Sequence, residues 1–515
     1  NIAVYGIQNI TPIISTSGSL SAFSACSGTN SATQNFSVSG SDMSAGILVN
    51  PPVGYEVSTT SDFSANVGTN GSGITVGSSG TIASTTIYVR TTTSATNGAG
   101  GNIELTSAGA TQVNVATGSA TISSNTYYVS TTGSDSNNGL TSGTAFATLQ
   151  KAIDMVGSSC ASTTIHVAAG TYTEDGVLIS NKSNIDIIGA GMNTTIFDGD
   201  LGNRFMAITG SSNNISISNM KIMEMDEKSV NGTYSGGGLY ITCSGTIDLT
   251  SLYFYKCKCS VNGGSGGGGA IYVGSSATVN VYKSKFTNNS DAQVNGSQDG
   301  ASICNLGSIL IENCLFHDNL RCQSNGYDGD IVFKNSASGS IVNSTLIYSS
   351  NCNVPIYMLN FASITVVNSI LWGSPGGYDI SDQSTGTITS VNCIGYTGNV
   401  WGNTKTNCYT TTDFGFTDLS GRDLTLSSSS YCIDKGTSSI SSPVSLTAPS
   451  DDFAGTTRSG NPDVGCYERV SNTWTGASSK AWTTTGNWSL GVLPTSADVI
   501  TIPDVTNQPV ITSNV

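Results

Sequence analysis

The chain has 515 residues, a length that allows about two to four domains, and only 10% of them are charged, with a net charge of −15. An acidic chain with 18 Lys and Arg and no basic run excludes nucleic acid as a partner, because phosphate binding needs a basic face. No stretch approaches the roughly 18 apolar residues of a membrane-spanning helix, and the 37% hydrophobic residues alternate with polar ones. The composition therefore favours packed strands over disorder.

Residues 1–10 are predicted to be a linker, and residues 11–122 to form an antiparallel β-sandwich. Short segments such as FSVSG, GILVN and TTIYVR alternate apolar and polar residues between Gly, Asn and Pro turns. The segments PPVGYEVS and GTIASTTIYVR resemble the immunoglobulin-like modules of large surface proteins of the Bacteroidota. The resemblance implies a spacer or adhesive unit without chemistry.

A short amphipathic helix is predicted from Ala145 to Val156. Its apolar face consists of Phe146, Leu149, Ala152, Ile153 and Val156. The helix precedes a long repetitive region, whose first strand would otherwise present an unpaired edge. We expect the helix to cap that end.

A short pattern then recurs nine times: apolar, any, apolar, any, and most often Asn. The last position of each repeat is Ala169, Gly189, Asn219, Ser251, Lys283, Asn313, Asn343, Asn368 and Asn392. A further apolar column follows three residues later, at Tyr172, Met192, Ile222, Phe254, Phe286, Phe316, Leu346 and Leu371. Such columns predict a parallel β-solenoid of about nine to eleven coils, in which Ile247, Val279 and Ile309 lie one above another.

The same region carries a family resemblance. The segments YYVSTTGSDSNNGLTSGTAFATLQKAIDMV, TIHVAAGTYTE, GGGLYITCSG and GGGAIYVGSS resemble right-handed parallel β-helix proteins of the pectate-lyase-like superfamily, and DDFAGTTRSGNPDVGCYER resembles the segment that closes bacterial surface β-helices. The superfamily holds polysaccharide lyases and non-enzymatic surface proteins. The resemblance covers roughly residues 126–470 and implies an all-β chain, followed by a partial C-terminal β module over 472–515.

Two columns allow both a structural and a functional interpretation. The asparagines are predicted to form a ladder of stacked amides at a tight turn, with a line of ligand-binding amides as the alternative. The members of this ladder are Asn219, Asn313, Asn343, Asn368 and Asn392. Phe254, Phe286 and Phe316 are predicted to stack in the core, with a sugar platform as the alternative.

A polysaccharide lyase on this scaffold would use Lys or Arg as the base and a cation to neutralise the uronate carboxylate. The preferred candidate bases are Lys258, Lys285 and Arg321, with Lys256 and Lys283 on neighbouring coils. Possible calcium ligands are Asp299, Asp328 and Asp330. Because no close cluster of carboxylates appears in the sequence, the lyase is the less favoured hypothesis.

Two other acidic groups offer alternatives. Asp451, Asp452 and Asp463 are a second possible calcium site, although Arg458 bridging carboxylates in a segment that covers the last coil is preferred. Glu224, Asp226 and Glu227 could supply the paired carboxylates of a glycoside hydrolase, but a solvated turn is preferred. No cofactor is certain, and calcium is possible.

The 13 cysteines contain no C-x-x-C pair and stand with only two histidines, which argues for disulfides rather than zinc. The candidate pairs are Cys322–Cys352, Cys393–Cys408 and Cys432–Cys466. His166 and His317 are expected at ordinary polar surface positions.

The sequence therefore predicts a secreted adhesin on the surface of a Gram-negative bacterium of the Bacteroidota. Its β-helix would present a face that binds extracellular glycans or other surfaces. The resemblance to modular surface proteins implies export or anchoring by outer-membrane machinery, plausibly type IX secretion. A polysaccharide lyase and a purely structural stalk remain the alternatives.

Overall fold

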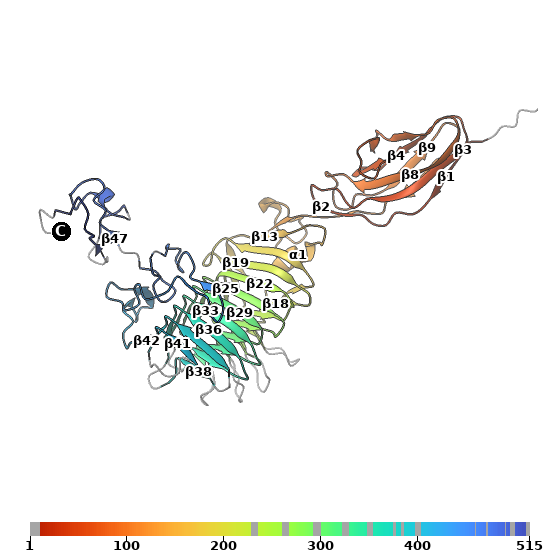
Figure 1. Cartoon of the computed structure of the whole chain (residues 1–515). Helices are drawn as coiled ribbons and strands as arrows, with labels where there is room; N and C mark the ends of the chain where they lie inside the picture. The colour runs from red at the N-terminus through yellow and green to blue at the C-terminus, as the bar shows by residue number, and fades with distance from the viewer. Residues whose placement is uncertain are drawn as a thin grey trace, which may run out of the picture. The chain divides into compact units, whose positions relative to one another are not determined.

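The computed structural model describes residues 11–227, 235–259, 267–291, 300–321, 329–347, 354–373, 377–382, 386–396, 403–458, 460–469, 472–489, 491–494 and 500–510. The chain divides into two compact units, the first built mainly from residues 1–128 and the second mainly from 166–515 (Figure 1). No helix among these described residues is long and apolar enough to cross a membrane.

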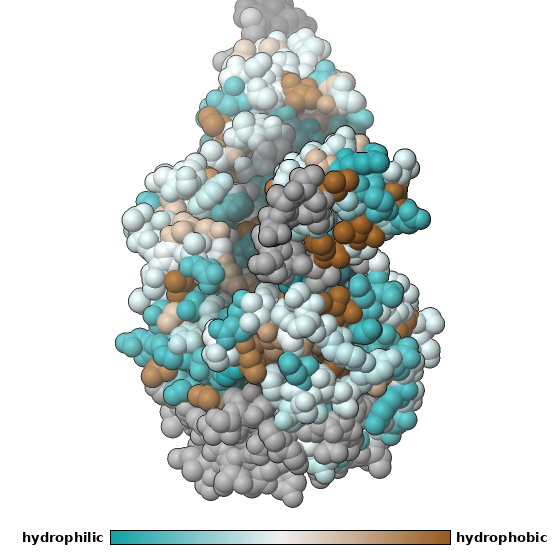
Figure 2. Space-filling view, turned by 90° about the vertical axis from the view of Figure 1, so that its left-hand side faces the viewer, coloured by the Kyte–Doolittle hydropathy of each residue, from teal (hydrophilic) through white to brown (hydrophobic). Residues whose placement is uncertain are grey.

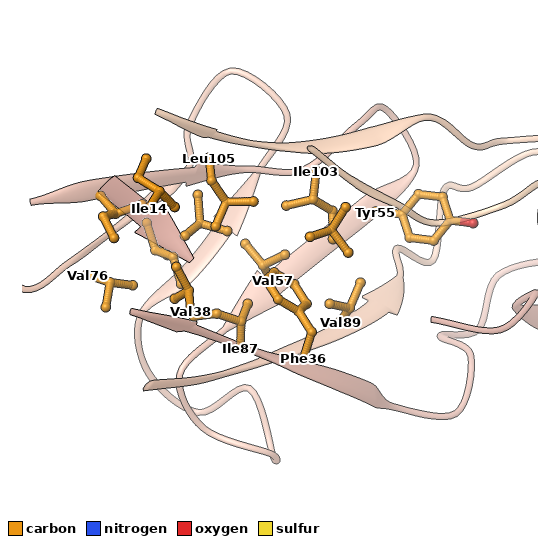
Figure 3. Packing of buried hydrophobic residues seen from close by; sticks show 14 of the residues in the cluster. Ile14, Phe36, Val38, Tyr55, Val57, Val76, Ile87, Val89, Ile103 and Leu105 are labelled. Carbon is orange, nitrogen blue, oxygen red and sulfur yellow. The ribbon is translucent and has the colours of Figure 1, made fainter. Parts of the chain in front are cut away.

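The first unit contains two antiparallel sheets. One has the order β1 (Ile13–Ser17), β3 (Gln34–Met43), β8 (Gly80–Thr91), β5 (Tyr55–Ser58) and β6 (Val67–Thr69). The other has the order β10 (Val113–Ala116), β9 (Asn102–Thr106), β4 (Ile47–Asn50) and β7 (Ile74–Val76). Phe36 and Ile87 of the first sheet share one buried core with Ile103 and Leu105 of the second (Figure 3). The immunoglobulin-like type of this sandwich stays a prediction.

A disulfide joins Cys26 to Cys160 within this unit. Cys26 ends β2 (Ser24–Cys26), which pairs in parallel with β11 (Thr121–Ser123). The bond links residues 134 positions apart. None of the predicted pairs included it, because the sequence places no repeat or fixed spacing between these two cysteines.

The second unit is a parallel β-helix, whose strands stack as a series of arrows in Figure 1. We call its strands the first, second and third rows, in the order in which the chain visits them in each coil. The first row consists of β13 (Thr163–Val167), β16 (Ser183–Gly189), β19 (Asn213–Met223), β22 (Thr246–Tyr255), β25 (Thr278–Tyr282), β29 (Ser308–Glu312), β33 (Ser338–Val342), β36 (Ser363–Val367), β39 (Thr387–Val391) and β41 (Thr404–Thr406). These ten described strands agree with the predicted number of coils.

The second row follows the Asn position. It consists of β14 (Gly170–Tyr172), β17 (Thr195–Asp198), the ends of β19 and β22, β26 (Lys285–Thr287), β30 (Leu315–His317), β34 (Thr345–Ile347), β37 (Ile370–Trp372), β40 (Ile394–Gly395) and β42 (Tyr409–Thr410). Both rows belong to one 19-stranded sheet that begins at β12 (Thr126–Val129).

The third row is a separate eight-stranded sheet. It consists of β15 (Val177–Ser180), β18 (Met206–Thr209), β21 (Leu239–Ile241), β24 (Ile271–Val273), β28 (Ile303–Asn305), β32 (Ile331–Phe333), β35 (Ile356–Met358) and β38 (Ile380–Asp382). A narrow fourth sheet contains β20 (Asp226–Glu227), β23 (Lys258–Cys259), β27 (Ser290–Asp291) and β31 (Leu320–Arg321).

The strand register confirms the central prediction from the repeats. Ile247 pairs with Val279, and Val279 pairs with Ile309 in the next coil. In the second row Phe286 stacks on Phe254 at 5.0 Å and on Phe316 at 4.4 Å, and all three rings are fully buried. The phenylalanine column is therefore core.

One assignment in that column was wrong. Phe197, not Met192, pairs with Tyr172 and with Ile222 of the following coil. Met192 lies in a turn that lengthens this coil before β17 begins. The chain also makes a tenth repeat, ending at Asn407, only 15 residues after Asn392, which the nine-repeat alignment missed.

The Asn position is the corner between the first and second rows. Its residue has a positive φ in every coil from Asn219 to Asn407, including Ser251 and Lys283 where Asn is replaced. Asn tolerates this left-handed geometry better than most residues. This accounts for the recurrence of Asn in the sequence.

Helix α1 (Leu149–Met155) is shorter than the predicted Ala145–Val156, and its first turn lies at the starting edge of the third row. The Glu174 carboxylate accepts hydrogen bonds from the backbone N–H groups of Leu149 (2.6 Å) and Gln150 (2.8 Å), which fixes the helix start. The Gln150 side chain accepts from the Leu178 N–H at 2.7 Å and donates to the Leu178 carbonyl at 3.3 Å. Gln150 thus bonds the edge strand β15 as a neighbouring strand would.

Residues 411–469, which we call the closing segment, run back along the side of the β-helix. The segment includes the hairpins β43 (Phe416–Asp418) with β44 (Asp423–Leu426) and β45 (Ser439–Ile440) with β46 (Leu446–Thr447). The Asn392 amide donates to the Lys435 carbonyl (2.7 Å), whereas Asp451 reaches Asn313 and Lys283, three and four coils earlier. The segment was predicted to cover the last coil, and the structure shows that it also extends over earlier coils.

The outer face of the second row explains how far the closing segment extends along the coils. In the later coils this face is apolar, and Ile370 and Ile394 pack against Phe414 and Val464 of the closing segment. In the earlier coils the same column holds Lys221, Tyr253 and Lys285, which the segment leaves partly exposed. The closing segment therefore covers the apolar part of this outer face and leaves the polar part partly exposed.

The described residues between 472 and 510 include two short strands and a tryptophan cluster. β47 (Asn472–Thr473) pairs in parallel with β48 (Ile500–Thr501). The ring centroids of Trp474 and Trp488 are 5.1 Å apart, and those of Trp482 and Trp488 are 4.7 Å apart. The boundary of this predicted module stays a prediction.

Candidate functional site

Four partly exposed side chains form a cluster on the second row, which we call the Lys–Tyr platform: Lys221, Tyr253, Tyr255 and Lys285. Tyr253 and Tyr255 flank the fully buried Phe254 in β22, so strand alternation turns both rings outward. Lys221 pairs with Tyr253 from the coil before and Lys285 from the coil after. Three successive coils thus contribute to one surface.

The distances show that the lysines lie against the rings. The two tyrosine rings are 5.8 Å apart. The Lys221 Nζ lies 4.9 Å from the Tyr253 centroid and 4.6 Å from that of Tyr255, and the Lys285 Nζ lies 5.3 Å from Tyr253. The Tyr253 hydroxyl is hydrogen-bonded to the Thr287 hydroxyl at 2.9 Å. Cation–π contacts and this bond hold the platform in one arrangement.

The platform lysines carry charge that the described residues do not neutralise by an ion pair. Lys256, at its margin, pairs with Glu224 at 2.9 Å, but neither Lys221 nor Lys285 has an ion-pair partner within the described part of the chain. Burial lowers the pKa of both lysines, and mutual repulsion lowers that of Lys285 further, against the opposing effect of Asp318. An anion bound here would stabilise both charged forms.

The closing segment supplies one rim of the platform. Arg422, in the turn between β43 and β44, makes a two-point ion pair with Asp318, with Nε 2.9 Å from Oδ2. His317 Nδ1 lies 2.8 Å from the same carboxylate. Burial raises the pKa of Asp318, but hydrogen bonds from Arg422 and His317 outweigh it and keep the pKa below its ordinary value.

His317 itself was predicted at the surface and is instead buried. It belongs to a column that holds Tyr255 two coils earlier and Ile347 in the next coil. The outer face becomes apolar and covered between those two coils. Burial is the main cause that lowers the pKa of His317. His166 is exposed, as expected.

Two of the candidate lyase bases lie in different sheets. Lys285 belongs to the platform, whereas Lys258 lies in the fourth sheet, paired with Asp226 and Ser290. Arg321 is also in the fourth sheet, where its backbone pairs with that of Asp291. The side chains of Arg321 and Asp291 lie outside the described part.

Of the first three possible calcium ligands, Asp299, Asp328 and Asp330, only Asp330 belongs to the described residues. Asp299 and Asp328 lie outside the described residues. Asp330 is buried and accepts hydrogen bonds from the Ser302 hydroxyl and from Asn319 Nδ2 (2.9 Å). Burial raises its pKa to about 6, against the effect of those two bonds. Asp330 therefore terminates an internal hydrogen-bond chain.

The second set of acidic residues holds the closing segment together. Asp451 pairs with Lys283 at 2.5 Å. Asp452 accepts from the backbone N–H of Thr456 (2.6 Å) and Glu468 (2.9 Å). Among the described residues no three His, Cys, Asp or Glu side chains are grouped so that they could hold a metal ion.

Asp463 and Arg458 complete the same network. The buried Asp463 carboxylate accepts from the N–H groups of Asp434 (2.7 Å) and Arg469 (2.6 Å), and burial raises its pKa to about 7. Arg458 pairs with Glu468 at 2.8 Å and donates to Asn313 Oδ1 at 2.9 Å. Arg458 was predicted to bridge carboxylates, and it instead joins one carboxylate to the side chain of a corner asparagine.

The acidic run at residues 224–227 was predicted to be a solvated turn, and this prediction was wrong for Asp226 and Glu227. Asp226 and Glu227 are each only 5% exposed and lie in β20. Glu227 pairs with Arg204 at 2.9 Å, and the Arg204 guanidinium stacks on Tyr240 at 4.5 Å. An arginine from the previous coil thus makes burial of this carboxylate possible.

The predicted asparagine ladder bonds mainly to the closing segment. The amide of Asn343 donates to the Asp463 carbonyl (3.1 Å), and that of Asn368 donates to the Thr437 carbonyl (2.8 Å) and to Asn343 Oδ1 (3.1 Å). No other amide bond within this column is present among the described residues. Because the closing segment occupies these amides, they do not form an open line of ligand-binding groups.

A different pair of stacked amides lies inside the β-helix. Asn289 Nδ2 donates to Asn319 Oδ1 at 3.0 Å, and Asn319 in turn donates to Asp330. Both asparagines are buried. The sequence signal for this pair is an Asn three residues after a column phenylalanine, at Phe286 and Phe316.

None of the three predicted disulfides is present among the described residues. Cys322 and Cys352 lie outside the described residues. Cys393, Cys408, Cys432 and Cys466 are all free thiols, so neither remaining pair is a disulfide in the structure. Cys393 and Cys408 do stand one above the other in successive coils, and their mutual hydrogen bond lowers the pKa of Cys408 to about 7.

Comparison with known proteins adds little to this description. No protein-family model matches the chain, and no curated protein matches it. Part of it resembles the structure of a pectin methylesterase in complex with a hexasaccharide (14% identity, TM-score 0.32, 54% of this chain and 92% of that one). Pectin methylesterase PemA from Erwinia chrysanthemi (13%, 0.30, 54% and 92%) and XylC in complex with xylose (10%, 0.30, 67% and 98%) also resemble it. Likeness at this level carries no argument about activity, and the β-helix assignment rests on the strand pairing.

Proposed function

We propose that this protein is a secreted cell-surface adhesin that binds an acidic polysaccharide on the Lys–Tyr platform. The observation that carries the proposal is the contact of Lys221 and Lys285 with the rings of Tyr253 and Tyr255 on an outward face. Aromatic rings pack against the apolar faces of sugars, and ammonium groups pair with carboxylates.

Charge favours an acidic ligand over a neutral one. Only 18 of the 515 residues are Lys or Arg, yet Lys221 and Lys285 lie together on this one surface. Lys256 and Arg422 beside them are already paired with Glu224 and Asp318. Lys221 and Lys285 are partly dehydrated and lack an ion pair within the described part. A uronate carboxylate would add direct ion pairs to the weaker attraction that Asp198, Glu224 and Asp318 exert on these lysines.

Secretion agrees with the Cys26–Cys160 disulfide, because such bonds persist in oxidising compartments. Export through the outer membrane of a Gram-negative bacterium of the Bacteroidota is part of the proposal. The surface seen in Figure 2 shows apolar side chains in several small areas separated by polar ones, which suits a protein exposed to water.

Calorimetric titration of the full chain with polygalacturonate or alginate tests the proposal. We expect binding that weakens with added salt and that falls by more than about tenfold when Lys221→Gln and Lys285→Gln are combined, because each lost ion pair costs about 1 kcal/mol or more. Lys405→Gln is the matched control, since Lys405 is exposed on a later coil. Equal binding by both variants would refute the platform.

A lyase is the second candidate, favoured by Lys285 alone, whose lowered pKa suits a base. Incubation with the same polymers distinguishes the two functions. An increase in ultraviolet absorbance from unsaturated uronate, abolished by Lys285→Ala, would replace the adhesin by an enzyme. Binding without any such absorbance supports the adhesin.

A further inference from the structure

A groove of about 470 Å³ lies on the first row, away from the Lys–Tyr platform. Strands β29, β33, β36 and β39 form its floor, and the hairpin of β45 and β46 forms its wall through Pro443, Val444 and Leu446. This volume is within the range of about 300–1,000 Å³ that is usual for small-molecule sites.

The floor presents two columns of hydroxyl groups in register. Ser338 pairs with Ser363, which pairs with Thr387 in the next coil. In the second column Ser340 pairs with Thr365, which pairs with Thr389. Successive coils place the members of a column about 4.8 Å apart, and the two columns are about 6.6 Å apart along the strands. The hydroxyls thus form a regular array along the β-helix axis.

These hydroxyls have no hydrogen-bond partner among the described residues. Elsewhere the buried hydroxyls of the same coils are bonded, as when Ser344 donates to the Val342 carbonyl (2.9 Å) and Ser369 to the Val367 carbonyl (2.8 Å). Thr365 and Thr389 are only 5% and 6% exposed, but their hydroxyls are not among the enclosed, unpaired polar atoms of the described residues, and Ser338, Ser363 and Thr387 are exposed. The hydroxyls therefore bond to solvent in the groove, which a ligand with hydroxyl groups of its own could replace.

The lining also defines the chemistry of such a ligand. No charged side chain lines the groove within the described residues. The nearest acidic group in the same column, Asp248, accepts from Asn280 Nδ2 at 2.8 Å. Hydroxyls on the floor, together with threonine methyls and an apolar wall, suit a ligand that is uncharged, rich in hydroxyls and apolar on its ring faces.

We propose that this groove binds a short segment of a neutral polysaccharide, with its sugar rings laid along the β-helix axis. Sugar hydroxyls exchange hydrogen bonds with the serine and threonine columns, and ring C–H groups pack on Pro443 and Val444. The site is independent of the Lys–Tyr platform, because it lies on the first row, on the other side of the corner formed by Asn313, Asn343 and Asn368.

Titration of the full chain with cellohexaose, xylohexaose and mannohexaose, followed by calorimetry, tests this site. We expect at least one of them to bind, and Thr365→Val and Thr389→Val each to weaken it about 3–10-fold, since each removes one hydrogen bond. Val keeps the shape of Thr, so thermal melting should change little. Thr246→Val is the matched control, because Thr246 lies in the same sheet face outside the groove.

Three outcomes would overturn the proposal. One is that none of the three hexasaccharides binds at millimolar concentration. Another is that binding survives in the double variant Thr365→Val with Thr389→Val. The third is that the double variant instead changes the sedimentation behaviour, which would make the groove a contact between two copies of the chain. Combined Lys221→Gln and Lys285→Gln should leave binding of the neutral sugar unchanged, which separates this site from the platform.

Discussion

The side-chain amide of Asn313 donates a hydrogen bond of 2.6 Å to the backbone carbonyl of Asp451, 138 residues later in the chain. The same pattern recurs at Asn343, Asn368 and Asn392, each of which bonds a backbone carbonyl of the closing segment. The asparagine corner therefore has two tasks. It turns the chain through a left-handed conformation, and it fixes a distant segment along the coils.

Substitution of Asn368 separates these two tasks. Asn368→Gly keeps the positive φ of 49° but removes the bonds to Thr437, so we expect the free energy of unfolding to fall by about 2–3 kcal/mol. Asn368→Ala should cost about 1–2 kcal/mol more, because a side chain in the left-handed region is strained. Urea unfolding followed by circular dichroism measures both.

The matched control is Asn360→Gly, at an exposed residue with a φ of 52° and one exposed hydrogen bond to Asn335. This change should stay within about 0.5 kcal/mol. If the two glycine variants are equally stable, the bonds to the closing segment contribute nothing.

Phe286 should be the most sensitive position of the phenylalanine column, because it stacks on a ring above and a ring below. We expect Phe286→Ala to lower the free energy of unfolding by about 3–5 kcal/mol, the usual cost of deleting a buried ring. Phe361→Ala, at a side chain that is 67% exposed, should be nearly neutral. Similar melting temperatures for the two variants would contradict stacking in the core.

The buried carboxyl of Asp330 should make stability depend on pH. Its folded pKa of about 6 lies above the value near 3.9 of an unfolded chain. The unfolded state therefore loses this proton first as pH rises. The contribution of Asp330 to the free energy of unfolding is fully present below about pH 4 and is lost as pH rises to about 6.

The variant Asp330→Asn has no such proton to lose. We expect it to be more stable than the wild type by up to about 3 kcal/mol at pH 7, with little difference at pH 4. Thermal melting at the two pH values measures this. Asp200→Asn, at an exposed loop position, should show no pH-dependent gain, and a gain for Asp330→Asn that is equal at both pH values would exclude burial of a titrating group.

The Cys26–Cys160 bond should stabilise the first unit selectively. It closes a long loop of the chain, so we expect the double variant Cys26→Ser with Cys160→Ser to lose about 4–5 kcal/mol. Alkylation of the unfolded, unreduced protein should label the other described thiols and leave these two unlabelled. Labelling of Cys26 or Cys160 under those conditions would disprove the bond.

The sequence predicted the parts of this structure that repeat. Ile247, Val279 and Ile309 recur at nearly fixed intervals, so their stacking follows from periodicity alone. The closing segment has no such period, and its partners depend on which outer faces are apolar in the folded coil. Its path beside Asn313 therefore had to come from the structure.

The candidate site, like the fold, could be predicted from the sequence only in part. Of the platform residues, only Lys285 was predicted to belong to a site, as a possible base. A single charged residue in the sequence does not show which side chains of the adjacent coils lie beside it. Tyr253 and Tyr255 alternate with Phe254, and that alternation would have placed them outward had it been combined with the coil alignment. The groove could not be predicted, since its wall at Pro443 comes from a hairpin that no repeat specifies.

The closing segment also sets an order on assembly. Coils that contain Lys283 and Asn313 are made long before Asp451 and Arg458, which bond to them. While the chain emerges from a ribosome or a translocation pore, N-terminus first, those corners can bond only to water. Truncation before residue 451 would leave the corners at Lys283 and Asn313 in that state permanently, so the integrity of these coils is decided by residues that follow them by 168 and 138 positions.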